Sequence, residues 1–153
     1  MNTQPILITV VERLAQKLPG LHVDFFPDAP DKFRLNHDTG AVLVSYGKSI
    51  YGKVQDIGAV VQSQTLRFTA TIVLRQLNGN GGAVDVLDYV RRALGGWTPP
   101  DCRRPIWLID DVFLGQNDGL WQYALNFATE TYFVQETEPD DRPLLTSVTY
   151  KEA

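Results

Sequence analysis

The sequence contains very little cysteine, since Cys102 is the only one among its 153 residues. A single cysteine cannot form a disulfide within the chain, and no cysteine or histidine spacing completes a zinc site. A chain of this length buries about 70% of the surface that it exposes when unfolded, which is enough for a core without cross-links. We therefore expect one domain over residues 1–153, in a cytoplasmic and not an oxidising environment.

Long apolar runs are also absent, and residues 1–5 lack the basic stretch and cleavage site of a signal peptide. We therefore expect neither a membrane span nor export by that route.

Positive charge is in deficit, because 14 Lys and Arg against 18 Asp and Glu give a net charge of −4. The deficit lies in residues 77–153, which carry 6 basic and 12 acidic side chains. Such a surface does not neutralise the phosphates of a duplex, so a sequence-reading DNA-binding protein is not expected.

Two stretches have the spacing of amphipathic helices. The first, residues 4–18, follows a Thr-x-Pro start and places apolar residues at Ile6, Val10, Leu14 and Leu18. The second, residues 83–94, ends at two glycines. Its buried side is predicted at Val84, Leu87, either Val90 or Arg91, and Leu94.

Runs of alternating or β-branched residues predict five strands, over residues 21–25, 41–46, 64–77, 106–114 and 120–135. The last two flank Gln-Asn-Asp-Gly at 116–119, which predicts a hairpin. Residues 47–63 contain three glycines and little periodicity, and this predicts a mobile loop.

These elements predict an α+β fold: a single domain with a mostly antiparallel mixed sheet and two main helices packed on one face. The polar C-terminal tail, residues 136–153, is expected to be flexible, although residues 144–150 could add an edge strand. We expect the strands at 64–77 and 120–135 to expose ladder edges, and such edges are commonly covered by another chain.

Several residues that could carry chemistry have simpler explanations. His22, Asp24, His37 and Asp38 could together hold a metal or move protons, but they match no metal-ligand motif. Asp110, Asp111 and Asp118 could bind a divalent ion, but neighbours in a strand point to opposite faces.

Three further features also favour structural roles over chemical ones. The glycine-rich segment 78–82 lacks the residues of a phosphate-binding loop, which favours a turn and helix cap. Cys102, beside Arg103 and Arg104, has no histidine close in sequence. Trp97, Trp107 and Trp121, with Tyr123 and Phe127, are expected in the core. We thus expect no catalytic residue, no metal and no other cofactor, and a protein that is not an enzyme.

The order of five segments is more informative: residues 21–24, 35–44, 64–68, 82–96 and 119–123. Together they resemble the small proteins of phage and prophage tail gene clusters that are similar to the Mu-like tail terminator, or tail-completion, proteins. The resemblance covers about residues 5–135. It implies a virion structural protein that forms a ring, a hexamer, on the tail tube, ends tube growth and provides the head-joining face.

The resemblance also implies partners and a location. The partners are other copies of the chain, the tail tube protein and the head–tail connector proteins, and DNA passes through without sequence-specific binding. The location is the virion tail, assembled in the host bacterial cytoplasm. An acidic lumen would suit this role because it repels DNA.

Ile50 and Tyr51, as exposed apolar residues of the 47–63 loop, are the candidate interface residues, although an ordinary surface loop explains them equally well. Two alternatives remain open from the sequence. One is a monomeric tail-completion or adaptor protein that binds another chain. The other is a small intracellular metal-dependent hydrolase or nuclease using the His22, Asp24, His37 and Asp38 group.

Overall fold

The computed structural model describes residues 2–137, so the predictions for the tail beyond Thr137 lie outside the described residues. The elements are α1 (Thr3–Lys17), β1 (His22–Phe25), the 3₁₀ turn η1 (Pro30–Lys32), β2 (Gly40–Tyr51), β3 (Val61–Leu74), α2 (Ala83–Leu94), β4 (Arg104–Asn117) and β5 (Leu120–Val134). No helix among the described residues is long and apolar enough to cross a membrane.

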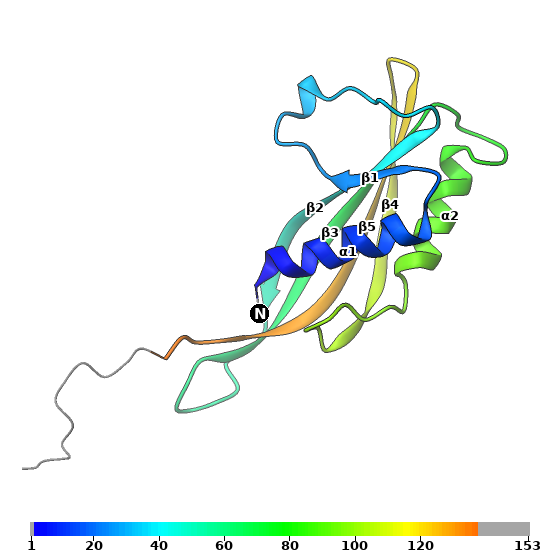
Figure 1. Cartoon of the computed structure of the whole chain (residues 1–153). Helices are drawn as coiled ribbons and strands as arrows, with labels where there is room; N and C mark the ends of the chain where they lie inside the picture. The colour runs from blue at the N-terminus through cyan, green and yellow to red at the C-terminus, as the bar shows by residue number, and fades with distance from the viewer. Residues whose placement is uncertain (1, 138–153) are drawn as a thin grey trace, which may run out of the picture.

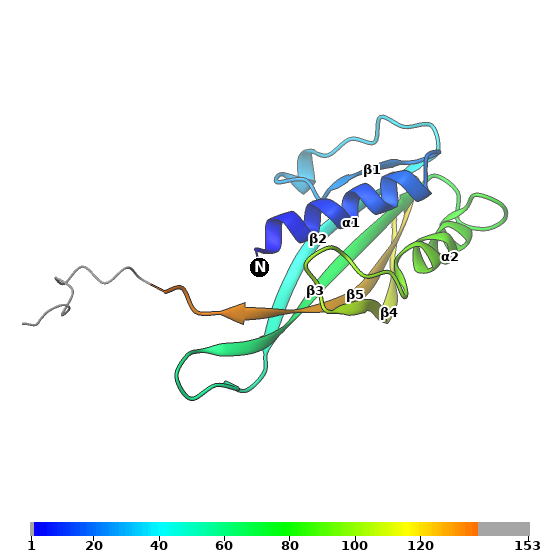
Figure 2. The same cartoon turned by 60° about the horizontal axis from the view of Figure 1, so that its bottom comes forward.

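The five strands form one sheet in the order β1-β2-β3-β5-β4. Only β1 and β2 pair in parallel, and the other three pairings are antiparallel. Both helices lie on the same side of this sheet, α1 over β1 and β2 and α2 over the strands toward β4 (Figures 1 and 2). The predicted α+β class, with a mixed and mostly antiparallel sheet, is therefore confirmed.

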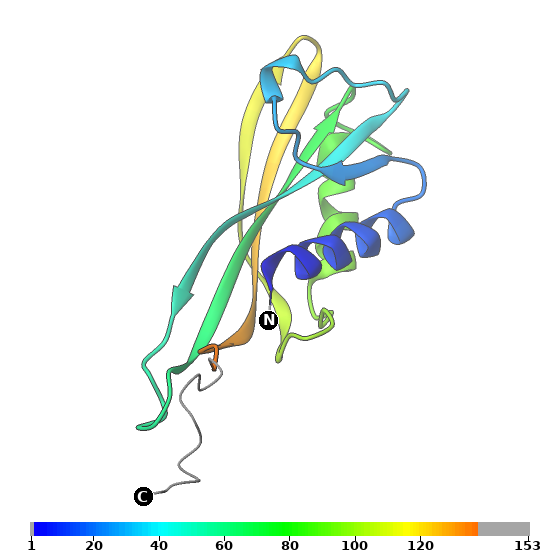
Figure 3. The ribbon, with the colours of Figure 1, turned by 60° about the vertical axis from the view of Figure 1, so that its left-hand side comes forward.

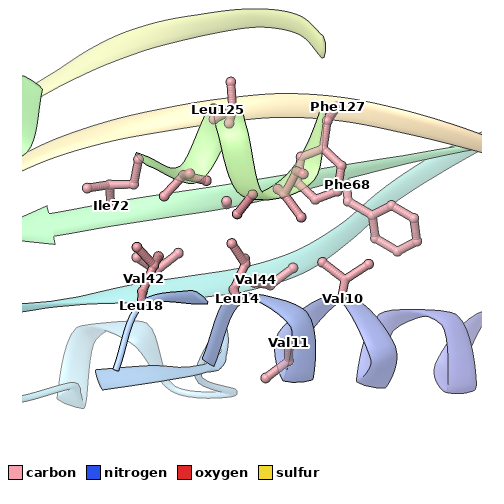
Figure 4. Packing of buried hydrophobic residues seen from close by; sticks show 14 of the residues in the cluster. Val10, Val11, Leu14, Leu18, Val42, Val44, Phe68, Ile72, Leu125 and Phe127 are labelled. Atoms are coloured by element: carbon pink, nitrogen blue, oxygen red, sulfur yellow. The ribbon is translucent and has the colours of Figure 1, made fainter. Parts of the chain in front are cut away.

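The core lies between the helices and the sheet. The four predicted apolar positions of the first helical stretch, from Ile6 to Leu18, are all buried. They face alternate residues of the strands, among them Val42, Val44 and Ile72 (Figure 4). Every second side chain of a strand points to the same face, so this alternation places one apolar row of each strand under the helices.

The register predicted for the second helix is wrong at one position. Val84 is 42% exposed, whereas Ala83, Val86, Leu87 and Val90 are buried. The reason is local: the N–H of Ala83 donates to the carbonyl of Gln76 at 2.8 Å, which fixes the first turn against the end of β3. Ala83 thus starts the buried stripe, and Val84 lies about 100° further round the helix.

Two stacked aromatic rings occupy the middle of the core. Phe68 of β3 and Phe127 of β5 are opposite each other in the ladder, with ring centroids 5.7 Å apart. Both are essentially inaccessible to solvent. Aromatic pairs of this kind add about 1 kcal/mol beyond the burial of their area.

The prediction that the strands at 64–77 and 120–135 expose ladder edges is wrong. β3 lies between β2 and β5, and β5 lies between β3 and β4, so both long strands have a partner on each side. The outer strands are the short β1 and the long β4. Sequence periodicity reports which face of a strand is buried, but it does not report which strands are neighbours.

The expected loop at 47–63 is strand at both of its ends. β2 continues to Tyr51 and β3 begins at Val61, which leaves residues 52–60 as the connection. Gly47 lies at a bulge between Tyr46 and Lys48. A Cβ at Gly52 would lie 2.3 Å from Oγ of Ser63, so close strand approach requires that glycine. Gly47 and Gly52 therefore reflect strand packing, whereas Gly58 lies in the connection with open space around it.

The predicted hairpin between β4 and β5 is confirmed. Asp118 and Gly119 both have positive φ, 53° and 78°. This is the backbone of a type I′ turn, whose twist matches that of the flanking strands.

We expect Phe127→Ala to lower the free energy of unfolding by about 3–5 kcal/mol, because it removes a fully buried ring and leaves a cavity. Phe133→Ala, on the same strand but 42% exposed, is the matched control and should cost about 1 kcal/mol or less. Urea unfolding followed by circular dichroism measures both. Equal losses would contradict the assignment of the core.

Candidate interaction surfaces

The two histidines of the candidate metal or proton-transfer group each interact with residues close to them in the chain. His22 and Asp24 of β1 are both about half exposed, with Nε2 and Oδ2 3.7 Å apart. Nδ1 of His37 accepts hydrogen bonds from the backbone N–H groups of Thr39 and Gly40, which closes the turn before β2. Within residues 2–137, no group of three His, Cys, Asp or Glu side chains could hold a metal ion.

The neighbouring carboxylates of β4 point to opposite faces, as predicted. Asp110 accepts a hydrogen bond from Nδ2 of Asn126 at 2.6 Å on the open face of the sheet. Asp111 pairs with Arg91 of α2 at 2.6 Å on the helix face. The pKa of Arg91 is raised above its ordinary value, chiefly by its hydrogen bond to Asp111. The two carboxylates therefore do not act together on an ion.

The glycine-rich segment before α2 is a turn and helix cap, as predicted. Gly79 and Gly81 both have positive φ. The N–H of Gly81 donates to Oδ2 of Asp85 at 2.9 Å. The carboxylate of Asp85 thus occupies a backbone donor that a phosphate would need, and favours the helix start through its negative charge.

Cys102 is half-buried on the loop before β4. Burial raises the pKa of its thiol, while a hydrogen bond with Thr129 acts in the opposite direction. Its neighbours Arg103 and Arg104 do not activate it, because both pair with the carboxylate of Glu130.

The aromatic residues expected in the core divide into two groups. Trp97, Trp121 and Tyr123 pack against the core, and Phe127 lies within it. Trp107 does not: it is opposite Ala128 in the ladder, with the guanidinium of Arg104 4.6 Å from its ring. Its neighbour Ile106 is buried in the core, so the two-residue period of a strand places Trp107 on the opposite face.

A cavity of about 210 Å³ lies between the segment after β1 and the open face of the sheet. Its walls include Phe33, Leu43 and Val73, together with exposed polar side chains. Pockets for small ligands in proteins are about 300–1,000 Å³ and largely enclosed. This cavity therefore does not define a small-molecule site.

The most distinctive surface is an arm, which we define as residues 48–65 together with residues 131–137. It comprises the far ends of β2 and β3, their connection, and the end of β5, and it continues past both helices (Figure 3). Among the described residues, the outer edge of β2 has no partner strand here, because β1 pairs only with Ala41–Val44.

The arm carries apolar side chains that nothing in the described chain covers. Ile50 is 47% and Tyr51 51% exposed, and Ile57 at the tip is fully exposed. The rings of Tyr51 and Phe133 meet edge to face at 6.3 Å beside a shallow hollow of about 220 Å³. The other exposed apolar residues of the arm are Val54, Val60 and Val134.

The sequence thus pointed to Ile50 and Tyr51 as exposed, but placed them in a loop instead of a strand. The remaining apolar residues of the arm were missed. The available signal was the isolated Val54 and Ile57 among polar residues, a pattern that matches neither a buried helix nor a buried strand.

A second group of exposed apolar side chains, the outer strip, lies on the two faces of β4. Leu108, Ile109, Val112, Phe113 and Leu114 are each between 37% and 52% exposed. Phe113 is anchored by the rings of Trp121 and Tyr123, at 6.3 Å and 5.2 Å. The strip was missed because the sequence assigned the open edges to other strands.

The fold and these surfaces define the class: a small α+β domain whose exposed apolar side chains gather on an arm and an outer strand instead of in an enclosed cleft. The chain belongs to the Gp37 protein family, whose family model matches residues 10–152.

The solved structures include a chain with a similar fold in the virion of a native gene transfer agent particle. The TM-score is 0.53 with 14% sequence identity, and the alignment covers 83% of this chain and 94% of that chain. At this identity the likeness establishes a shared fold. No curated protein sequence matches this chain.

Cys102 should react with iodoacetamide several-fold more slowly in the native protein than in urea, because burial raises its pKa and lowers the thiolate fraction at neutral pH. Labelling rates measured by mass spectrometry between pH 7 and pH 9 test this. Native labelling that is faster than in urea would indicate an activated thiol.

Proposed function

We propose that the chain is a structural protein of a phage or phage-like virion and acts as a tail terminator. In this proposal, copies assemble into a ring, a hexamer, that caps the tail tube, ends its polymerisation and presents the face that joins the head. Its partners are other copies, the tail tube protein and the head–tail connector proteins. DNA passes through the ring without sequence-specific binding.

Two comparisons support the general part of this proposal. The family match extends over most of the chain, and the similar fold in the gene transfer agent particle belongs to a virion protein. The resemblance of segment order to the Mu-like tail terminators supports the specific part. It also suggests the location, the virion tail, and assembly in the host bacterial cytoplasm.

The observation that carries the proposal is the arm. Apolar surface in water costs about 25 cal/mol per Å², so a monomer gains nothing from exposing Ile50, Tyr51 and Ile57 together. Contiguous exposed apolar surface in proteins typically marks a protein–protein interface. A projecting arm also suits assembly, because it reaches a neighbour without disturbing the core.

Most polar groups beside the arm pair with one another, although the buried Nε of Arg67 has no hydrogen-bond partner among the described residues. On the open face, Thr69 donates to Asn126 at 2.6 Å, and Asn126 in turn donates to Asp110. Nearby, the carboxylate of Glu130 forms ion pairs with Arg103 and Arg104. These groups satisfy one another, as expected for a structural surface.

Light scattering over a range of concentration and salt tests the ring. We expect a mass that rises toward six copies of the 17.2 kDa chain, about 103 kDa. A strict monomer under every condition would instead favour the monomeric adaptor. Metal analysis of the purified protein addresses the hydrolase alternative, which requires a bound divalent ion.

The double substitution Ile50→Asp with Tyr51→Asp should abolish assembly, because each Asp would bury a charge in the interface at a cost of several kcal/mol. The matched control is Val84→Asp, an equally exposed apolar residue at the start of α2, where a negative charge suits the helix. The readout is again the mass in solution. Unchanged assembly by the double variant would refute the role of these two residues.

The terminator role itself is tested with purified tail tube protein. Adding the wild-type chain during tube polymerisation should narrow the distribution of tube lengths in electron micrographs, while the double variant should not. Tubes of unchanged length distribution with bound wild-type chain would contradict the terminator role but not a virion role.

A further inference from the structure

Basic side chains surround a surface hollow between the two helices, on the side of the molecule opposite the open face of the sheet. The hollow has a volume of about 230 Å³, and its walls are Arg13, Lys17, Tyr89, Arg92 and Ala93. Three of these five residues are cationic and none is acidic. We call this feature the basic hollow.

Contacts within the chain hold both arginines of the basic hollow in place. The Nε–H group of Arg13 donates to the carbonyl oxygen of Ala93 at 2.9 Å, and its guanidinium carbon lies 5.2 Å from the centre of the Trp97 ring. The guanidinium carbon of Arg92 lies 4.9 Å from the centre of the Tyr89 ring. A guanidinium beside an aromatic ring keeps N–H donors in its own plane, in a fork that matches a carboxylate. The basic hollow is therefore arranged for an anion in advance.

The positive charge of the basic hollow is not neutralised within residues 2–137. None of Arg13, Lys17 and Arg92 forms an ion pair there, whereas the adjacent Arg91 pairs with two aspartates. Lys17 and Arg92 lie in the last turns of α1 and α2, where a positive charge is favourable for the helix dipole. That explains each of them singly, but not why they meet Arg13 at one place, since like charges repel.

The most acidic stretch of the sequence follows directly after the arm. Residues 136–141, which we call the acidic stretch, read Glu-Thr-Glu-Pro-Asp-Asp and contain four carboxylates and no basic side chain. Glu136 is exposed. The family model continues through this stretch to residue 152, so the stretch belongs to the matched part of the chain. Its charge is opposite to that of the basic hollow.

We infer that the acidic stretch of one copy binds the basic hollow of a neighbouring copy. This inference rests on the proposed ring and names one contact between its subunits. Carboxylates accept charge-assisted hydrogen bonds from guanidinium and ammonium groups, and those from arginine can be bidentate. Because the basic hollow is open to solvent, a single ion pair contributes little, and the contact depends on several acting together.

The acidic stretch lies too far along the arm to cover the basic hollow of its own chain. The end of α2 is level with Ala128 of β5, because the residues that follow α2 form backbone hydrogen bonds with Ile106, beside that position. From there β5 continues for six residues to Val134, about 20 Å. Figure 1 shows the end of β5 and α2 on opposite sides of the molecule. The five residues from Glu136 to Asp141 span at most about 18 Å, so the four carboxylates cannot gather at that hollow.

A nucleic acid is the alternative occupant of the basic hollow, because phosphates also bind arginine forks. The net charge of −4 on the chain repels a long polyanion, and one hollow offers few phosphate contacts. A short acidic segment of protein fits both observations. Duplex DNA therefore enters the test as the competing occupant.

Binding of a synthetic peptide to the full chain tests the inference. The receptor is a tail-neutral variant, in which four substitutions remove the charge of its own acidic stretch: Glu136→Gln, Glu138→Gln, Asp140→Asn and Asp141→Asn. A fluorescein-labelled peptide of residues 134–141 should bind this variant saturably in fluorescence anisotropy, and added salt should weaken the binding. The same peptide with amides in place of its four carboxylates should not bind.

Two further substitutions in the receptor show where the peptide binds. Lys17→Glu with Arg92→Glu should weaken binding by about tenfold or more, because both reverse a charge of the basic hollow. Lys53→Glu, which reverses an exposed cation on the connection of the arm, is the matched control and should leave binding unchanged. A peptide with lysine in place of its four acids should bind the reversed hollow in preference to the original one. Circular dichroism spectra and thermal midpoints close to the wild type establish that the variants are folded.

The peptide experiment can overturn the inference in three ways. The tail-neutral variant would not bind the peptide, the two substitutions in the basic hollow would leave binding unchanged, or a duplex of 20 base pairs would bind at the basic hollow where the peptide does not. Each of these results leaves the proposed function intact, because the ring is judged by the mass in solution and the terminator role by tube length.

Cross-linking distinguishes a neighbouring copy from the same chain. A photoreactive amino acid is placed at position 137 in a mixture of unlabelled and nitrogen-15-labelled chains. Cross-links to peptides from residues 13–17 and 89–93 should then include pairs of one labelled and one unlabelled chain. Cross-links confined to a single isotope would overturn the inference, and so would the absence of cross-links to both segments in chains that assemble.

Discussion

The uninterrupted antiparallel pairing of β3 with β5 is the constraint on which the rest of the structure depends. The two strands are paired without a register shift from Val61 opposite Val134 to Leu74 opposite Trp121. Every register irregularity of the sheet lies instead in the pairings of β2 and β4. The central pair therefore fixes one face for the helices, with Phe68 and Phe127 at its centre, and leaves the outer strands free to bend and project.

Much of the fold follows from local patterns that the sequence displays. Helical spacing identified α1 and α2 to within a residue or two, and Asn-Asp-Gly identified the turn between β4 and β5. Local rules also placed Asp110 and Asp111 on opposite faces. These features depend only on residues close together in the chain, and such information is fully present in a single sequence.

Features that depend on distant residues were not predictable in the same way. The order of the strands decides which edges are open, and it is set by packing between segments that are far apart in sequence. Gly47 and Gly52 resemble loop residues until the partner strand, with Ser63 opposite, is known. The exposure of Ile50 and Tyr51 was foreseen, but the arm that carries them and the strip on β4 required the sheet order.

The bulge at Gly47 has a geometric consequence for any assembly built through the arm. It lies where β2 leaves the helix-covered part of the sheet, so it affects how β2 follows β3 into the hairpin. In a closed circle of identical subunits, the number of members equals a full turn divided by the angle between neighbours. The unbroken β3–β5 pair and the bulge beside it would then fix that angle together, and a change in either would alter the diameter of the circle while the core stayed the same.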